Sequence, residues 1–135
     1  MLLLCLLSSA AATAPTVATQ YGPVSGFSEG SVDIFRSIPY ASPPTGKRRF
    51  RPPVPPSNWT VTKDAAKQPN SCPQPGAAAA VVPVSSVTGN EDCLYLQVYS
   101  PSSGSASPKP VLLFVHGGAS CTATRGISAC TTALD

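Results

Sequence analysis

The chain has 135 residues, of which 16 are proline and 10 are glycine, so it can form one small domain of short elements rather than long helices. Its net charge of +3 is local, because one cluster, Lys47, Arg48, Arg49 and Arg51, carries +4. A nucleic-acid surface needs basic charge spread along a face and interleaved with aromatic side chains. The sequence lacks that pattern, and we expect no nucleic-acid partner.

The amino-terminal segment is apolar and then rich in small residues, and its first charged residue is Glu29. This predicts a secretory signal over residues 1–12, although the usual positive n-region is missing. Small-x-small sites place the cut after Ala12 or Ala14, and we favour Ala12 because a proline directly follows the other site. The alternative is a short buried or membrane-associated segment, since the run is too short to span a bilayer. We expect a secreted, extracellular protein with no stable membrane span.

Cysteine usage agrees with that compartment. Removal of the leader would remove Cys5 and leave four others: Cys72, Cys93, Cys121 and Cys130. An even number in an oxidising environment favours disulfides, whose pairing these residues alone leave open. A metal site is the competing interpretation, but the sequence has no Cys-x-x-Cys pair and a single histidine, His116. We therefore expect disulfides and no metal.

The first predicted elements are strands. Val17–Thr19 and Val24–Phe27 flank a turn signal at Tyr21-Gly22-Pro23, and Val32–Ile38 can pair with them. Together they predict a small antiparallel sheet near the mature N-terminus. Pro39–Pro56 follows as a proline-rich loop.

The remaining elements alternate between loops and strands. Ala65–Lys67 is expected to form one helical turn, and Gly76–Gly89 is a low-complexity segment expected on the surface. Apolar and polar residues alternate along Leu94–Tyr99, as in a half-buried strand. A Ser/Gly/Pro hairpin connection is expected over Pro101–Pro110, and the apolar run Val111–Val115 predicts a strand buried on both faces.

A series of motifs resembles one family. In chain order they are Gly22-Pro23-Val24-x-Gly26, Phe35-Arg36-Ser37-Ile38-Pro39-Tyr40-Ala41, Pro43-Pro44-x-Gly46, Arg49-Phe50, Pro52-Pro53, Trp59, Cys72-Pro73-Gln74, Glu91-Asp92-Cys93-Leu94-Tyr95-Leu96 and the strand into His116-Gly117-Gly118. With them the chain resembles the N-terminal part of the type-B carboxylesterase family, in particular a secreted fungal-type member. It departs from the family at Gln97, where Asn, Asp or Ser is usual, and at Ala119, where a third glycine is common.

The resemblance implies an α/β fold, namely the N-terminal portion of an α/β-hydrolase. A small antiparallel N-terminal sheet and the first strands of the central sheet would occupy residues 15–119. Residues 120–135 resemble nothing in the family, and we expect that the reading frame departs near Ala119, through truncation, a frameshift or an unspliced intron. Without the sheet's neighbours and covering helices, Val111–Val115 would form an exposed apolar edge, and the chain would be poorly soluble.

The resemblance also implies a chemistry. The backbone N–H groups of Gly118 and Ala119 would form an oxyanion hole, while His116 and Gly117 would shape the loop. His116 is not the catalytic base, because in α/β-hydrolases that histidine follows the nucleophile and the acid in the chain. We expect a serine-type carboxylic-ester hydrolase without its triad, using no cofactor and inactive alone. The alternative is a secreted, disulfide-stapled binding module or decoy.

A second candidate nucleophile lies downstream. Gly126-Ile127-Ser128-Ala129-Cys130 nearly matches the G-x-S-x-G nucleophile elbow, but its final glycine is replaced. The short interval after Gly118 cannot supply a crossover helix and a parallel strand. We therefore reject Ser128 as a nucleophile and expect no catalytic residue in the sequence.

Three structural features complete the expectations. By resemblance, Cys72 and Cys93 pair in a disulfide, and Arg49 and Glu91 form a buried ion pair; an unpartnered surface arginine is the alternative. Asn58 begins an N-glycosylation sequon, which fits a secreted chain unless burial of the following tryptophan blocks it.

Overall fold

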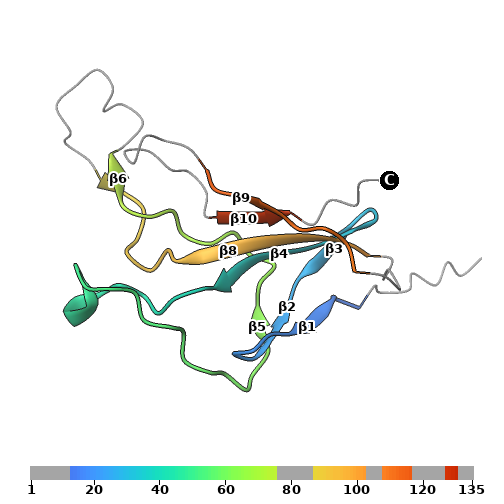
Figure 1. The fold of residues 1–135 in the computed structure, drawn as a ribbon, viewed down its shortest axis with the longest axis horizontal. Coiled ribbons are helices and arrows are strands. Elements are labelled where there is room, and N and C mark those ends of the chain that lie inside the picture. Colours follow the sequence, from blue (N-terminus) through green and yellow to red (C-terminus); the bar gives the residue numbers. More distant parts are fainter. Residues whose placement is uncertain (1–12, 76–86, 103–107, 117–126, 131–135) are drawn as a thin grey trace, which may run out of the picture.

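Figure 1 shows the computed structural model, which describes residues 13–75, 87–102, 108–116 and 127–130. Within these ranges the chain forms short β-strands, one turn of 3₁₀ helix and no α-helix. The elements are β1 (Thr16–Ala18), β2 (Pro23–Ser25), β3 (Phe27–Glu29), β4 (Val32–Pro39), η1 (Gly46–Arg48), β5 (Lys63–Asp64), β6 (Gln74–Pro75), β7 (Val87–Thr88), β8 (Tyr95–Pro101), β9 (Leu112–Phe114) and β10 (Ile127–Cys130). Apart from β4 and β8, the strands are short because prolines and glycines repeatedly interrupt backbone pairing.

A small sheet in the order β1-β2-β5 is built around the predicted turn. β1 and β2 are antiparallel, with Val17 opposite Val24, and β5 joins β2 in parallel. Gly22 has a φ of +150°, and a Cβ at this position would overlap the Trp59 carbonyl oxygen and approach its ring. The glycine therefore allows both the turn and the close packing of the Trp59 loop against it.

The larger sheet has the order β3-β4-β8-β10-β9. β4 is antiparallel to both β3 and β8, with a register irregularity between Phe35 and Ile38. β10 lies between β8 and β9, parallel to β8 and antiparallel to β9, and the sheet is therefore mixed. β8 and β9 are not paired with each other, and the prediction of a hairpin across Pro101–Pro110 is wrong.

The N-terminal strands pair antiparallel as predicted, β1 with β2 and β3 with β4, but the two pairs lie in different sheets, so the prediction of a single sheet is wrong. The predicted strand Val24–Phe27 breaks at Gly26 into β2 and β3. A Cβ at Gly26 would overlap the Ile34 carbonyl oxygen, and the Gly26 N–H donates to the Pro15 carbonyl oxygen at 2.9 Å. Glycine thus lets the chain cross closely over β4, which carries β3 into the larger sheet.

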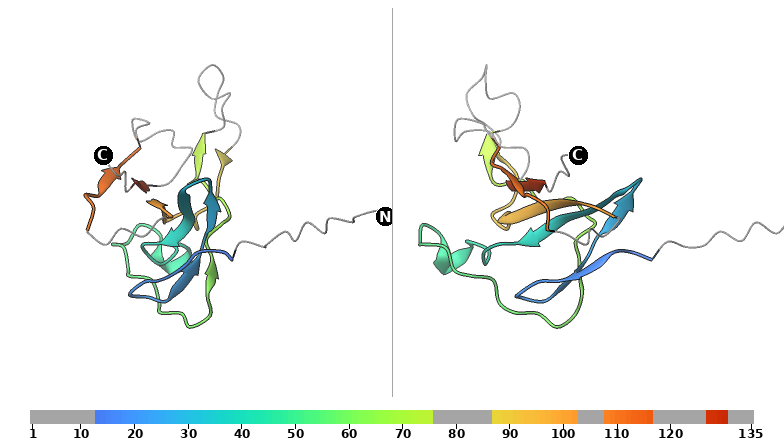
Figure 2. Two further views of the ribbon diagram at one scale, coloured as in Figure 1. Left: turned by 90° about the vertical axis from the view of Figure 1, so that its right-hand side faces the viewer. Right: turned by 45° about the vertical axis from the view of Figure 1, so that its right-hand side comes forward.

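The core lies between the small sheet and one side of β4 and β8, an arrangement visible in Figures 1 and 2. Its members are Val24, Phe35 and Ala65, with Ile38, Trp59 and Val98 packed against them. The predicted helical turn at Ala65–Lys67 is wrong. The Ala65 N–H donates to the Ser25 carbonyl oxygen at 2.7 Å, and its own carbonyl accepts from the Arg36 N–H at 2.6 Å. This extended backbone joins β2 to β4, which a helical turn could not do.

β9 contradicts the prediction of a strand buried on both faces. It is the edge strand of the larger sheet, and Leu112, Leu113 and Phe114 are 60%, 63% and 56% exposed. A strand buried on both faces needs a covering layer on each side, and no described element lies over β9. The expectation of an exposed apolar edge is confirmed.

Several predictions concern residues outside the described ranges. These are the leader over 1–12, most of the low-complexity segment (76–86), the middle of the Pro101–Pro110 connection, and the loop after His116. β6 and β7 pair antiparallel on either side of residues 76–86. Across the part of the chain that is described, no helix has the length and apolar character needed to cross a membrane.

Candidate functional site

β9 leads into the expected oxyanion loop. Its antiparallel pairing with β10, Leu113 opposite Ala129, sets the direction in which the chain approaches half-buried His116. Gly117, Gly118 and Ala119 lie outside the described residues. The assignment of their backbone N–H groups therefore stays a prediction.

Ser128 lies within β10, where its backbone is opposite Gln97 of β8 on one side and Phe114 of β9 on the other. A nucleophile elbow requires a sharp turn from a strand into a helix, which lifts the serine above the sheet. A residue inside a strand that is paired on both sides does not have this geometry. The topology gives an independent reason to reject Ser128.

Cys72 and Cys93 form a disulfide, with their Cα atoms 5.0 Å apart. Next to it, the Asn90 N–H donates to the Ser71 carbonyl oxygen at 2.8 Å, so the two ends of the enclosed segment also meet through their backbones. Gly89 has a φ of +98°, and a Cβ there would overlap the Cys72 carbonyl oxygen. Closing a loop of this length stabilises the fold by about 3 kcal/mol in the chain-entropy account.

Arg49 and Glu91 form an ion pair with 2.6 Å between Nε and Oε1. The pair joins the proline-rich loop to the segment before β8. It is half-exposed, at 53% and 38%, rather than buried as expected. The ring of the neighbouring Phe50 lies 5.3 Å from the Arg49 guanidinium but is itself 95% exposed, so the pair stays at the surface. Pairs with this exposure contribute about 0–1 kcal/mol. Both partners line a cavity of about 290 Å³ together with Cys72 and Cys93, so these four predicted residues meet in one place.

Asn58 is exposed, although the side chain of the neighbouring Trp59 is half-buried and packs against the fold. The indole N–H of Trp59 donates to the Pro23 carbonyl oxygen at 2.8 Å. The Trp59 ring stacks on the Tyr21 ring, with 6.3 Å between the ring centroids, and the Lys63 ammonium lies 4.3 Å from the centre of the Trp59 ring. Packing of the tryptophan therefore does not bury the asparagine. Glycosylation of Asn58 stays a prediction.

Sequence reasoning missed the burial of Gln97. The alternating pattern places it on the polar face of its strand, but the residue is only 2% exposed. Its Oε1 accepts a hydrogen bond from the Tyr99 hydroxyl at 2.9 Å, whereas Nε2 has no partner in the structure. Its departure from the family's usual Asn, Asp or Ser is the one signal that singled it out.

Among the described residues, Tyr95 has the most strongly shifted pKa. Its hydroxyl donates to Asp92 Oδ1 at 2.8 Å. Burial, and then the hydrogen bond and charge of Asp92, raise the pKa of Tyr95 to about 12. No group of three or more His, Cys, Asp or Glu side chains that could hold a metal ion occurs among the described residues.

Known proteins share this strand arrangement. A thermophilic PNB esterase structure superposes with a TM-score of 0.66 at 36% identity, covering 82% of this chain and 23% of the esterase. Para-nitrobenzyl esterase of Bacillus subtilis is 41% identical over 103 residues, which are 76% of this chain and 21% of the relative. Thyroglobulin of Sus scrofa is 48% identical over 94 residues, which are 70% of this chain and 3% of the relative.

The chain thus spans about a fifth of the length of the esterases it matches. The model of the carboxylesterase family matches residues 13–131, a range that takes in most of the segment expected to be foreign. The boundary at residue 119 stays a prediction. With a family match over most of its length and a partial α/β-hydrolase fold, the chain belongs to the carboxylesterase family.

Proposed function

We propose that this chain supplies the N-terminal part of a secreted serine carboxylic-ester hydrolase, including the oxyanion loop. The supporting observation is β9, an apolar strand that runs into His116-Gly117-Gly118 within a chain of this family. In this proposal a serine attacks the ester carbonyl to form an acyl-enzyme, and water then hydrolyses it without a metal or cofactor. The backbone N–H groups of Gly118 and Ala119 stabilise the developing oxyanion.

The catalytic serine, histidine and acid are not assigned to this sequence. Its single histidine, His116, belongs to the loop motif, whereas the catalytic histidine of an α/β-hydrolase follows the nucleophile and the acid in the chain. Ser128 lies inside a paired strand. We therefore propose that the chain alone does not hydrolyse esters. In this proposal the chain contributes the backbone N–H donors of the oxyanion hole. Loss of one such donor typically lowers turnover by about 10²–10³-fold.

A chimera tests the hydrolase proposal. Residues 13–119 would replace the aligned segment of the Bacillus subtilis para-nitrobenzyl esterase, and hydrolysis of a p-nitrophenyl ester would be measured. We expect a folded chimera with turnover within about tenfold of the parent, because the donated loop positions the same N–H groups. A chimera that melts cooperatively but does not hydrolyse the ester would reject the proposal.

A second candidate function is a non-catalytic binding module. It is favoured by the 48% identity to thyroglobulin, a relative whose name does not denote an esterase. The chain would then be a rigid scaffold held by the Cys72–Cys93 disulfide. The two candidates differ in the chimera assay, because a binding module has no requirement for donors in the loop.

Secretion and the fungal-type subgroup also remain proposals. The disulfide supports secretion, because such bonds persist in oxidising compartments. N-terminal sequencing of the product exported by a eukaryotic host is expected to begin at Thr13, after cleavage at Ala12. Full retention of the chain inside the cell would contradict this proposal.

A further inference from the structure

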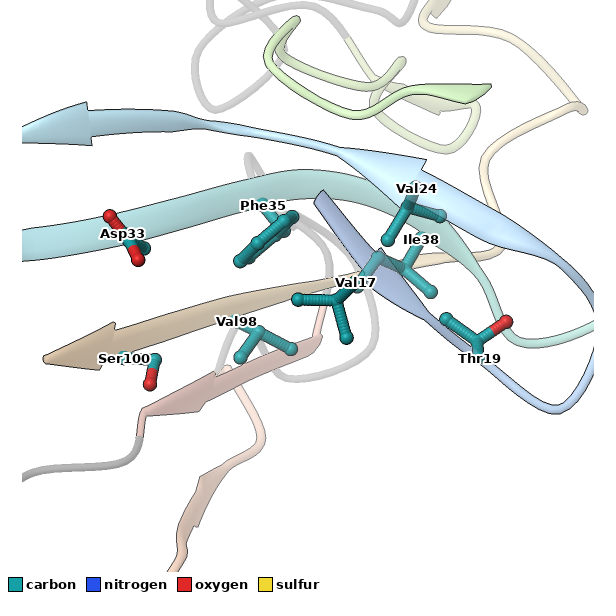
Figure 3. Close-up of a pocket in the computed structure, with 8 residues that line it drawn as sticks. All are labelled: Val17, Thr19, Val24, Asp33, Phe35, Ile38, Val98 and Ser100. Carbon is teal, nitrogen blue, oxygen red and sulfur yellow. The ribbon is translucent and has the colours of Figure 1, made fainter. Parts of the chain in front are cut away.

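A cavity lies between the small sheet and the larger sheet, with β1 and β2 on one side and β4 and β8 on the other. None of its lining residues belongs to β9. The cavity has a volume of about 330 Å³ (Figure 3). Small-molecule sites generally occupy about 300–1,000 Å³, so this space suits a small ligand. Nothing in the proposed hydrolase chemistry uses it.

The strand register explains the lining of the cavity. Asp33 is opposite Ser100 on the β4–β8 ladder, and Phe35 is opposite Val98 two positions further along. Because side chains alternate between the faces of a strand, all four project from the same face. Figure 3 shows the carboxylate and the serine hydroxyl at one end and the apolar side chains in the middle.

The opposite wall is apolar and comes from the small sheet. Val17 and Val24 are register partners in β1 and β2, and both line the cavity. Ile38 and Thr19 lie toward the end away from Asp33, as Figure 3 shows. Asp33 and Ile38 are five residue steps apart along β4, on the order of 15 Å, a span that suits an extended chain.

The charge at one end restricts the ligand. Asp33 Oδ1 accepts a hydrogen bond from the Ser28 hydroxyl at 2.6 Å. Within the described ranges, neither ion pair involves Asp33. A half-buried carboxylate with a hydroxyl donor and no basic partner attracts a cation that can also donate a hydrogen bond.

We propose that the cavity binds an alkylammonium ligand, that is, a straight apolar chain that ends in a protonated amine. The ammonium donates to Asp33 and Ser100, and the chain lies against Phe35 and Val98. Neither the carboxylate nor the cavity belongs to the oxyanion loop, so the proposal is independent of ester hydrolysis.

The test is calorimetric titration of the folded chain with butylamine, hexylamine and octylamine below their micelle-forming concentrations. Burial of each methylene is expected to tighten binding about fourfold, and the increase stops when the cavity is full. Octylamine should bind more tightly than 1-octanol, and sodium octanoate should bind more weakly than both. Equal affinity for the amine and the octanoate would overturn the proposal.

Two matched variants locate the charge effect. Asp33→Asn should weaken octylamine binding about fivefold and leave 1-octanol binding unchanged. Glu29→Gln removes the same charge from an exposed residue of β3 that does not line the cavity, and it should change neither. If the two variants behave alike, the assignment to Asp33 is wrong. If Asp33→Asn does not fold, Ser100→Ala takes its place, with a smaller loss expected for the amine.

Amide chemical shifts separate this cavity from the exposed apolar edge, the other surface that could take an alkyl chain. Octylamine should shift resonances of β1, β4 and β8. Shifts confined to β9 would place the ligand on the edge strand and overturn the proposal, as would the absence of any binding.

Discussion

The side-chain oxygen of Gln97 accepts a hydrogen bond from the Tyr99 hydroxyl at 2.9 Å, while the amide nitrogen of the same side chain is buried without a partner. One polar end is therefore satisfied and the other is not. A buried donor left unpaired costs about 1–3 kcal/mol. The buried, unpaired amide of Gln97 therefore lowers the free energy of unfolding.

Replacing Gln97 with methionine tests this cost. Gln97→Met keeps the length of the side chain and removes the unpaired N–H, and the half-buried Tyr99 hydroxyl can turn to water. The free energy of unfolding should rise by about 1 kcal/mol in urea denaturation. Gln97→Glu is the control, and it should destabilise because it buries a charge. A methionine variant less stable than the parent would contradict the account.

Gly22 and Gly30 provide a comparison of two positions at which a residue with a Cβ would be strained. Both have positive φ, but a Cβ at Gly22 meets Trp59, whereas a Cβ at Gly30 meets nothing within 4 Å. Gly30→Ala should cost about 1–2 kcal/mol from its backbone alone. Gly22→Ala should cost about 1–3 kcal/mol more, because the Trp59 loop must move. Equal losses in thermal denaturation would show that the Trp59 contact is unimportant.

The raised pKa of Tyr95 predicts that the fold loses stability in alkali. Its pKa of about 12 in the fold exceeds the ordinary value of 10.0, so the neutral phenol is favoured by folding. This contribution is fully present below pH 10 and is lost as the pH rises toward 12. Melting temperatures measured across that range should fall, and less steeply for Tyr95→Phe. Asp92→Asn should lower the pKa of Tyr95 in a tyrosinate absorbance titration without restoring 10.0, because burial is the larger cause. An unchanged titration would exclude a role for Asp92.

β9 predicts self-association of the chain. Its three residues are all more than half exposed at the edge of a sheet, which is a template for pairing with another strand. Leu113→Lys should reduce light scattering at high concentration and change the unfolding free energy by about 0.5 kcal/mol or less. Val61→Lys, at a 79% exposed loop position, adds the same charge away from the edge and should not improve solubility. Equal improvement by both variants would mean that net charge, not the edge, is responsible.

Local sequence signals predicted the strands well. The Gly22 turn, the β-branched residues of β4 and the alternation along β8 all depend on neighbouring residues. Which strands share a sheet depends on contacts between distant segments. The crossing at Gly26 and the extended backbone at Ala65 therefore escaped prediction, although both positions carry small residues that such contacts require.

In the candidate site, only the side-chain contacts that the family resemblance implies could be predicted from the sequence. It implied the pairing of Cys72 with Cys93 and of Arg49 with Glu91, and both contacts are present. It did not give their exposure, because burial depends on which elements cover a residue. The cavity at Asp33 arises from the packing of two sheets, and no single motif encodes it.

In the proposed hydrolase, Ala119 contributes a backbone N–H to ester hydrolysis. The most direct measurement compares Ala119→Pro with Ala119→Gly in the chimera with para-nitrobenzyl esterase, using kcat for a p-nitrophenyl ester and melting curves to confirm folding. Proline removes the N–H and glycine keeps it. We expect kcat to fall about 10²–10³-fold in the proline variant alone. A folded proline variant that retains the parent kcat would contradict it.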